Sequence, residues 1–540
     1  MDTHEVLNQV PPLEGYDALA SDPVLADAVS REGGKWGLDE IGEWGRTVTA
    51  PGVYQLADQA NRNDPVLRTH DRFGHRTDNV EFHPAWHELL GMSVQAGLHC
   101  LPFERPAGEG ARVVRDAKFS LMSQIEQGHG CPISMTTSVL PALRANPSLH
   151  QQWEAGIVSR VYDPEFAPAP DKAGVLLGMG MTEKQGGSDV RANTTTARPA
   201  GDGEYRLTGH KWFTSAPMCD AFLVLAQAPG GLSCFLLPRF LPDTTQNPLR
   251  LVRLKDKLGN RSNASSEIEF DNTAAWLVGD EGKGVQTIIE MVNHTRLDCV
   301  VGSVGIMRQA VSQAAWHVAH RSAFGAKLID KPLMANVVAD LELEVEAATL
   351  MMVRLSGAFD RAGIDADEEA FRRIATPVAK YWVTKRCTEV VRESMECLGG
   401  NGYVEESIMP RLFRESPLNA IWEGSGNVIA LDVARAIARS PGSLDMFLET
   451  WSDGHPQVAD LAADIRDVGG STLGEEALAR RLTERLALGW AASLLDRYTP
   501  TEVADAYRSS RLAGDHGSLY GTLNSGLPLR SIADRAMPAS

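Results

Sequence analysis

Residues 419–439 read NAIWEGSGNVIALDVARAIAR. Apolar residues recur at helical spacing after Gly426, whereas the stretch before it places one carboxylate, Glu423, between Trp422 and a Gly-Ser-Gly-Asn run. Glycines let a backbone turn sharply and approach a ligand closely. A carboxylate that a neighbouring tryptophan partly desolvates is suited to act as a general base. The alternative is a solvated glutamate at the end of a helix, which is the commoner case.

The helical period extends well beyond this stretch. Apolar residues at helical spacing run through 285–440, 1–174 and 441–540, whereas 175–284 holds short β-rich runs punctuated by Gly, Pro, Asn and Asp. We therefore expect a mainly α fold with a central β-domain. The predicted domains are an N-terminal helical domain (1–174), a β-domain (175–284), a helical bundle that carries Glu423 (285–440) and a further C-terminal helical domain (441–540).

The composition is that of an acidic globular protein. The chain has 540 residues, a formal net charge of −18 and a pI near 5.3. Bulk charge of this sign disfavours general binding to nucleic acid or to an anionic membrane. The apolar run AGVLLGMGM is too short to span a bilayer, and the N-terminal stretch has no signal-peptide pattern. Seven scattered cysteines without a Cys-x-x-Cys pair indicate reduced thiols, so we expect a cytoplasmic protein.

Two segments of the β-domain are candidates for ligand binding. GMGMTEKQGGSDVRANTTT (178–196) combines glycines with hydroxyl groups, and TGHKWFTSA (208–216) places adjacent aromatic residues beside hydroxyls, which suits a flat ring system. Ordinary turn chemistry and an ordinary β-core are the alternatives. Neither segment has the glycine spacing of a Rossmann site or the Gly-Lys-Ser/Thr of a P-loop.

The histidines do not predict a metal site. His83 and His87 are four residues apart, and His317 and His320 three apart, but neither pair has cysteine or carboxylate partners at a recognised spacing. A Gly-x-Ser-x-Gly nucleophile motif is also missing from the sequence. We expect histidines of the core or the surface, and no metal.

Seven motifs together resemble one family, the acyl-CoA dehydrogenase flavoproteins. In chain order they are MTEKQGGSD, GHKWFTS, KLGNRSNASSEIEF, GDEGKGV, HRSAFGAKL, LGGNGYVEES and IWEGSGN. The segments GGLSCFLLPRF and RLKDKLGNRSNAS, with the additional C-terminal domain, resemble the AidB-type branch, the adaptive-response flavoproteins. The resemblance implies an acyl-CoA dehydrogenase-like fold, with an N-terminal helical domain, a β-barrel and a C-terminal helical bundle.

The resemblance also implies tightly held FAD and a homotetramer. The residues expected to contact FAD within one chain are Met181, Thr182, Ser188, Phe213, Thr214, Ser215, Ser425 and Asn427. Those in segments expected to reach FAD across a subunit interface are Arg321, Phe324, Gly399 and Gly400. Phe213 stands where many relatives have tryptophan, and Ser215 where they have threonine. Lys184 replaces a proline common in the family, which puts the usual acyl-chain pocket in question.

The resemblance implies that Glu423 is the catalytic base. It takes the α-proton of an acyl-CoA thioester while hydride leaves the β-carbon for the flavin, and hydrogen-bond donors polarise the thioester carbonyl. The break in the helical region would turn the chain so that this carboxylate faces the substrate. The resemblance therefore implies an acyl-CoA dehydrogenase-like flavoenzyme, with weak activity in the AidB-type branch.

Two functions compete at this point. One is a metabolic acyl-CoA dehydrogenase without DNA binding, and the other is a flavoprotein that binds double-stranded DNA in defence against alkylation, as the AidB-type resemblance implies. Residues 441–540 hold nine arginines, no lysine and fourteen acidic residues, a net charge of −5, which disfavours DNA binding. The arginines at helical spacing that remain candidates for phosphate contact are Arg481, Arg485, Arg508 and Arg511. The alternative for each is a solvated helix face.

Overall fold

The structure is a computed structural model that describes residues 3–440, 442–452, 454–472 and 475–539. The chain forms two compact units. The helical unit comprises Met1–Tyr54, Arg105–Ile125 and Cys299–Ser540, and the β-unit comprises Gln55–Glu104 and Glu126–Asp298. Two helices, α3 (Pro51–Arg62) and α8 (Gly284–His320), each have residues in both units.

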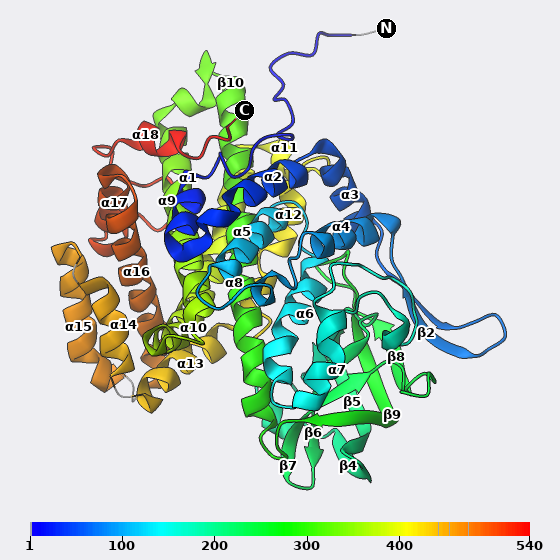
Figure 1. The fold of residues 1–540 in the computed structure, drawn as a ribbon. Coiled ribbons are helices and arrows are strands. Elements are labelled where there is room, and N and C mark those ends of the chain that lie inside the picture. The colour runs from blue at the N-terminus through cyan, green and yellow to red at the C-terminus, as the bar shows by residue number, and fades with distance from the viewer. Residues whose placement is uncertain (1–2, 441, 453, 473–474, 540) are drawn as a thin grey trace. The chain divides into compact units, whose positions relative to one another are not determined.

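The β-unit is built on one seven-stranded sheet (Figure 1). Strands β4, β5, β9, β7 and β6 pair in that order, and β6 pairs again with β4, so the circuit closes. β3 adds in parallel to β6, and β8 adds antiparallel to β9. The strands are β3 (Leu177–Gly180), β4 (Thr196–Gly201), β5 (Glu204–Ser215), β6 (Ala221–Ala228), β7 (Gly231–Pro238), β8 (Leu249–Leu254) and β9 (Ser265–Val278). Their position confirms the predicted central β segment.

Three helices and a hairpin complete the β-unit. The helices are α4 (Pro84–Gln95), α6 (Gly130–Leu143) and α7 (Pro147–Ile157), and α6 packs against β3. α7 begins where Asn146 accepts a hydrogen bond from the amide of Leu149, with proline in the first turn. The hairpin of β1 (Val66–His70) and β2 (Arg76–Glu81) lies where the sequence predicted only helices and connections. Its strands carry mostly polar residues, so no apolar alternation marked them.

The helical unit is centred on α9 (Pro332–Arg361), which is buried along most of its length. It packs against α10 (Ala366–Cys397), which begins where Asp365 accepts hydrogen bonds from the amides of Asp367 and Glu368. The other helices of this part are α1 (Pro23–Val29), α2 (Leu38–Val48), α5 (Ala111–Ser123), α11 (Gly400–Tyr403), α12 (Met409–Glu415) and α13 (Gly426–Arg439). The short strands β10 (Ser322–Ala323) and β11 (Ala326–Lys327) pair antiparallel and form a hairpin.

Short helical turns link these elements. The 3₁₀ turns are Lys35–Gly37, Leu101–Phe103, Ala169–Asp171, Val190–Ala192, Leu328–Asp330, Leu418–Ala420 and Glu476–Leu478, and the π-helical turns are Ser30–Gly34 and Arg508–Leu512.

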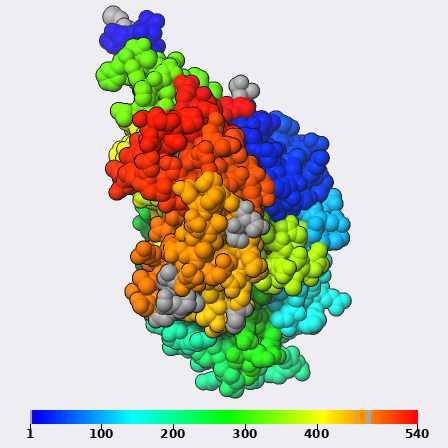
Figure 2. Space-filling model, turned by 90° about the vertical axis from the view of Figure 1, so that its left-hand side faces the viewer, coloured from blue at the N-terminus to red at the C-terminus, as the bar shows by residue number. Residues whose placement is uncertain are grey.

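The C-terminal segment shares a core with the rest of the helical unit. Its helices are α14 (Ser443–Ser452), α15 (Pro456–Thr472), α16 (Ala479–Tyr498), α17 (Thr501–Tyr507) and α18 (Leu529–Asp534). Phe371 of α10 packs 5.5 Å from Trp490 and 5.5 Å from Phe447, ring centre to ring centre, and all three rings are buried. In Figure 2 the segment runs from orange to red over the face turned to the viewer. Its burial of large aromatic side chains makes it an integral layer of this unit.

Within the described residues, no helix has the length and apolarity needed to cross a bilayer. All seven cysteines are buried. The described part of the chain contains no cluster of three or more His, Cys, Asp or Glu residues arranged to hold a metal ion.

Candidate active site

Glu423 lies in a short loop between the 3₁₀ turn Leu418–Ala420 and α13. Its φ is +57° and that of Gly424 is +108°, so two successive residues adopt left-handed backbone conformations. Such a conformation strains a residue with a side chain, and it recurs at functional sites because the surroundings hold it in place. The loop therefore turns abruptly at the carboxylate, as the sequence suggested, and Glu423 is half-buried.

A buried amide holds the entrance of this loop. Asn419 Nδ2 donates to Ser303 Oγ of α8 at 3.1 Å, and Asn419 Oδ1 accepts from Trp422 Nε1 at 2.9 Å. The indole beside Glu423 is thus fixed to α8 through one side chain. Nothing in the sequence pattern marked Asn419, since its partner Ser303 lies 116 residues away.

The exit of the loop is the N-terminus of α13. Ser425 is the N-cap residue, but its side chain makes no capping bond, and both Ser425 and Asn427 are exposed. The free amides of a first helical turn attract anions. The two predicted cofactor residues therefore stand beside Glu423 with their polar groups open to a ligand that carries phosphates.

In the β-unit, the segments around Thr182 and Phe213 lie side by side. The amide of Trp212 donates to the carbonyl oxygen of Thr182 at 2.8 Å, which ties β5 to the loop after β3. Met181 and Thr182 are partly exposed, as is Ser215, and Ser188 and Phe213 are exposed. Thr214 points the other way: its hydroxyl is buried, and a Cβ on Gly180 would lie 2.9 Å from it. The surface that could face a cofactor thus includes five of the six predicted residues of this unit.

A buried ion pair fixes the loop after β3 from behind. Glu183 Oε1 lies 2.7 Å from Lys211 Nζ, and its other oxygen accepts from the amide and hydroxyl of Thr194. Burial alone would raise the pKa of Glu183, but the hydrogen bonds from Lys211 and Thr195 outweigh it and lower the pKa to about 2. The carboxylate therefore stays ionised at neutral pH and locks the glycine-rich loop onto β5.

A buried Ser-His-Glu chain also occurs in the β-unit. His129 Nε2 lies 2.9 Å from Ser93 Oγ, and His129 Nδ1 lies 2.5 Å from Glu126 Oε2. Glu126 also accepts hydrogen bonds from Asn61 and Ser262. The order of groups is that of a hydrolase triad, but all three side chains are buried. The satisfied carboxylate gives this chain a structural role that joins α3, α4 and the loop before β9.

Of the residues predicted to reach a neighbouring subunit, Phe324, Gly399 and Gly400 are exposed in the helical unit, and Arg321 is half-buried. Phe324 stands at the tip of the β10–β11 hairpin with φ +52° and 95 % of its surface exposed. Arg321, at the base of that hairpin, donates to the carbonyl of Asn8. Gly399, with φ +60°, and Gly400 face open space. A partner surface could approach all of these positions.

Two of the four arginines predicted to contact nucleic acid are buried. Arg511 pairs with Asp340 and Glu344 of α9, and Arg508 pairs with Asp496 and Asp505. Both side chains are less than a tenth exposed. Their charges are neutralised inside the protein, so their geometry gives no support to a role in binding phosphate.

The other two arginines are nearer the surface. Arg485 pairs with Asp464, whereas Arg481 is exposed and makes no ion pair within the described ranges. Of the predicted set, Arg481 alone therefore presents a charge that no carboxylate of the described chain neutralises.

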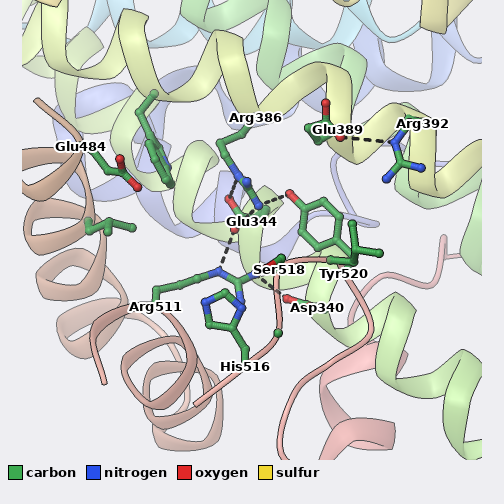
Figure 3. A pocket seen from close by; sticks show the side chains of 14 residues that line it. Asp340, Glu344, Arg386, Glu389, Arg392, Glu484, Arg511, His516, Ser518 and Tyr520 are labelled. Atoms are coloured by element: carbon green, nitrogen blue, oxygen red, sulfur yellow. Dashed lines mark hydrogen bonds and ion pairs between the residues drawn. The ribbon is translucent and has the colours of Figure 1, made fainter. Parts of the chain in front are cut away.

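Arg511 lines a cavity of about 190 Å³ in the helical unit (Figure 3). α9, α10 and α16 contribute to it, together with the loop 516–520. Arg386 donates to Glu344 and to Tyr520 there, and Arg511 donates to Glu344 and Asp340. Because the guanidinium groups already bond to these acids, the cavity is a by-product of an internal ion network, not an anion site.

The predicted FAD residues fit that cofactor within each unit. FAD combines a flat ring system with a diphosphate. The β-unit offers Thr182, Ser215 and the exposed ring of Phe213, and the helical unit offers the first turn of α13 with the unused hydroxyl of Ser425. A Cβ on Gly186 would meet nothing within 4 Å, so the backbone there is open to close approach.

Models of known families match most of residues 8–438. "Adaptive response protein AidB N-terminal domain" matches residues 8–164, "Acyl-CoA dehydrogenase, middle domain" matches 178–273 and "Acyl-CoA dehydrogenase, C-terminal domain" matches 282–438. Among curated proteins, the Escherichia coli (strain K12) protein named "Putative acyl-CoA dehydrogenase AidB" is 45 % identical over 94 % of this chain and 94 % of its own length. Caenorhabditis elegans "Acyl-CoA dehydrogenase family member 11" is 33 % identical over 74 % of this chain and 66 % of its own.

Solved structures share the fold over nearly the full length. C. elegans ACDH-11, solved in complex with C11-CoA, superimposes with a TM-score of 0.86 at 25 % identity, covering 95 % of this chain and 94 % of that one. A structure described as Bd2924 in its apo form gives a TM-score of 0.83 at 26 % identity, with 91 % and 99 % coverage. These matches confirm the predicted acyl-CoA dehydrogenase fold. By sequence and by fold, the chain belongs to the acyl-CoA dehydrogenase family of FAD-dependent flavoenzymes, within its AidB-type branch.

Proposed function

We propose that this protein oxidises an acyl-CoA thioester at its α and β carbons, with Glu423 as the base. The observation that carries the proposal is the loop at Glu423, where two left-handed residues present one half-buried carboxylate at the start of α13. The C11-CoA complex of a structure that matches 95 % of this chain supports a thioester as substrate. Bound FAD supplies the acceptor for the hydride.

In this mechanism the protein moves one proton and orients the reactants. The carboxylate of Glu423 takes the proton from the α-carbon and holds it at its own oxygen. The partial burial of Glu423 limits access of water to that carboxylate. In the β-unit, the ion pair of Glu183 and Lys211 keeps the glycine-rich loop in one conformation, so Thr182 and Ser188 are held ready for the cofactor.

Flavin reduction tests this proposal. Anaerobic mixing with acyl-CoAs of increasing chain length should bleach the bound flavin for at least one chain length. Glu423→Gln keeps size and loses basicity, so it should retain FAD and slow bleaching by about 10²-fold or more. Glu406→Gln, an exposed glutamate of the same unit, is the matched control and should behave as wild type. Bleaching at the wild-type rate in Glu423→Gln would remove this residue from the mechanism.

We propose, as a second function, weak and sequence-independent binding to double-stranded DNA in defence against alkylation. The 45 % identity to AidB and the match to the adaptive-response domain support it. So do exposed cations on α13 and α16, two helices that pack against each other. Arg435, Arg439 and Arg481 are exposed and pair with no carboxylate in the described part of the chain, and Arg480 donates to the hydroxyl of Tyr381.

A salt series tests DNA binding without truncating the chain. The affinity for a random duplex should fall with salt, with a log–log slope near 0.9 per phosphate contacted. The double variant Arg435→Gln/Arg481→Gln should lower that slope by about 2. Arg530→Gln, whose guanidinium pairs with Asp330 and Asp534, is the control and should leave the slope unchanged. No retardation at low salt by the flavin-loaded protein would exclude this function and leave the dehydrogenase proposal standing.

We also propose a homotetramer located in the cytoplasm. Phe324, Leu333 and Tyr403 expose 95 %, 81 % and 80 % of their surfaces in the helical unit, and these apolar side chains are available for contact with another subunit. Light scattering on the purified protein should give four times the chain mass of 58.6 kDa. Phe324→Asp should lower the measured mass if the hairpin tip lies in an interface.

A further inference from the structure

A buried lysine contacts the carbonyl oxygens of both residues that flank Glu423. Lys380 of α10 is 1 % exposed, and its Nζ donates to the carbonyl oxygen of Trp422 at 2.9 Å and to that of Gly424. These two carbonyls belong to the residues immediately before and after the candidate base. The ammonium of Lys380 therefore bonds to the backbone on both sides of Glu423, the residue on which the proposed chemistry depends.

This contact explains how the left-handed backbone persists. A left-handed conformation is strained for a residue with a side chain, so Glu423 would relax if nothing held its neighbours. In the observed conformation the carbonyls of residues 422 and 424 both accept from one ammonium. Hydrogen bonds from a charged donor are stronger than those between neutral groups, and two of them here oppose the strain. Because α10 is a rigid helix, its lysine fixes the loop in space as well as in conformation.

The loop is held from two sides. Asn419 ties the indole of Trp422 to Ser303 of α8, and Lys380 ties the backbone on either side of Glu423 to α10. Asn419 acts before the turn, whereas Lys380 acts at the turn itself. Removing Lys380 should therefore free the backbone of residues 422–424 while the indole stays anchored.

We propose that Lys380 is a positioning residue that holds Glu423 in its left-handed conformation and so aims the base at the substrate. This inference rests on the proposed role of Glu423. Lys380 acts through the loop, so its loss should lower the rate of proton abstraction and leave cofactor and substrate binding intact. A misplacement of about 1 Å in a catalytic group can cost on the order of 10² in rate.

The first test measures the loop without relying on activity. Hydrogen exchange of the peptide covering 418–428 should speed up in Lys380→Met, which keeps the length of the side chain and removes its donors. Arg392→Met is the matched control, since it removes a cation from the same helix whose ion pairs are with Glu389, Glu393 and Glu396 of that helix. Unchanged exchange in Lys380→Met would overturn the inference, whatever the activity of the enzyme.

The second test separates positioning from general stability. In Lys380→Met, kcat should fall about 10²-fold. The FAD content and the KM for the best acyl-CoA should stay within about threefold of the wild-type values. Lys380→Arg, which keeps charge and donors, should recover part of this loss. Faster exchange with an unchanged kcat would mean that the loop is held but not for catalysis, and would also overturn the inference.

A double variant covers the case in which Lys380→Met folds poorly. Glycine adopts positive φ at little cost, so Glu423→Gly should relieve the strain that Lys380 opposes. The loss of melting temperature caused by Lys380→Met should then be smaller in the Glu423→Gly background, and an equal loss in both backgrounds would contradict the inference. If no acyl-CoA bleaches the wild-type flavin, the proposed function fails, while exchange and melting still decide whether Lys380 holds the loop.

Discussion

At the scale of single residues, the turn at Glu423 depends on Gly424 as much as on its neighbours. Gly424 has φ +108°, and an added Cβ would lie 3.0 Å from Ile429 Cδ1. Gly424→Ala should therefore destabilise the protein by about 1–2 kcal/mol through backbone strain and a tight contact. Gly363→Ala is the control, because a Cβ there would meet nothing within 4 Å and its effect should stay within about 0.5 kcal/mol. Denaturant unfolding of both variants measures the difference.

A second residue-scale prediction concerns Glu183. Its pKa is lowered to about 2 in the folded protein, from an ordinary value of 4.5. A lowered folded pKa gives stability that is present above the ordinary value and lost as pH falls toward 2. Wild type should thus lose melting temperature steeply over this interval, and Glu183→Gln should show a flatter profile with lower stability at neutral pH. Parallel profiles for the two proteins would contradict the assignment.

The sequence identified the residue at the turn but not the residues that hold it. Glu423 was visible because glycines break a helical pattern around an isolated acid. Lys380 lies 42 residues before Trp422 and Ser303 lies 116 residues before Asn419, so no local pattern connects them. Thr214 shows the converse: its motif suggested a cofactor contact, yet strand geometry turns its hydroxyl into the interior.

At the scale of elements, α9 carries four buried carboxylates in seven residues. They are Asp340, Glu342, Glu344 and Glu346, each at most 2 % exposed. Arg386 and Arg511 pair with Asp340 and Glu344 on one side. The other two form a separate cluster with Arg308, Arg535 and Asp22.

That second cluster predicts a pH dependence. In this cluster three buried carboxylates face only two guanidinium groups. One of the carboxylates therefore keeps its proton to a higher pH than it would in water. Burial, with Glu346 nearby, raises the pKa of Glu342 to about 8, although Arg308 opposes the shift. A raised folded pKa of an acid means that the folded state binds the extra proton, so stability declines as pH rises from 4.5 to about 8. Thermal melts across this range should show the decline in wild type, and Glu342→Gln should flatten it.

The aromatic core between α10 and the C-terminal segment gives a further prediction for this scale. Phe447 is fully buried and packs against Phe371 and Trp490. Phe447→Ala should cost about 3–5 kcal/mol, because it removes a large ring and leaves a cavity. Phe413→Ala, a ring 36 % exposed, should cost much less. Denaturant midpoints of the two variants provide the comparison.

At the scale of the whole molecule, the sequence predicted the order of helical and β segments and the family. It could do so because long periodic helices and an ordered set of motifs are local signals. The predicted boundaries at 174, 284 and 440 remain predictions. The described structure groups residues 441–540 with 299–440 in one compact unit, which periodicity alone cannot reveal because it depends on contacts between distant segments.

This grouping predicts the outcome of truncation. A chain that ends at Arg439 would expose Phe371 and deprive Asp340, Glu344 and Glu346 of arginines from the C-terminal segment. Breaking a buried ion pair by removing one partner costs about 3–5 kcal/mol, and two arginines are lost here. The truncated protein should therefore fail to yield a cooperatively folded flavoprotein. A stable, yellow product that melts as wild type would show that the segment is a separable domain.

The run DLELEVE (340–346) in α9 also helps to interpret the sequences of relatives. Its alternation is typical of an exposed strand, yet here it forms a buried helix whose acids depend on Arg511 and Arg535, 171 and 189 residues downstream. Relatives that end near the counterpart of Arg439 should therefore carry apolar or amide side chains in place of Asp340 and Glu346. Acids at these two positions would then mark, from sequence alone, the family members whose C-terminal extension is built into the fold.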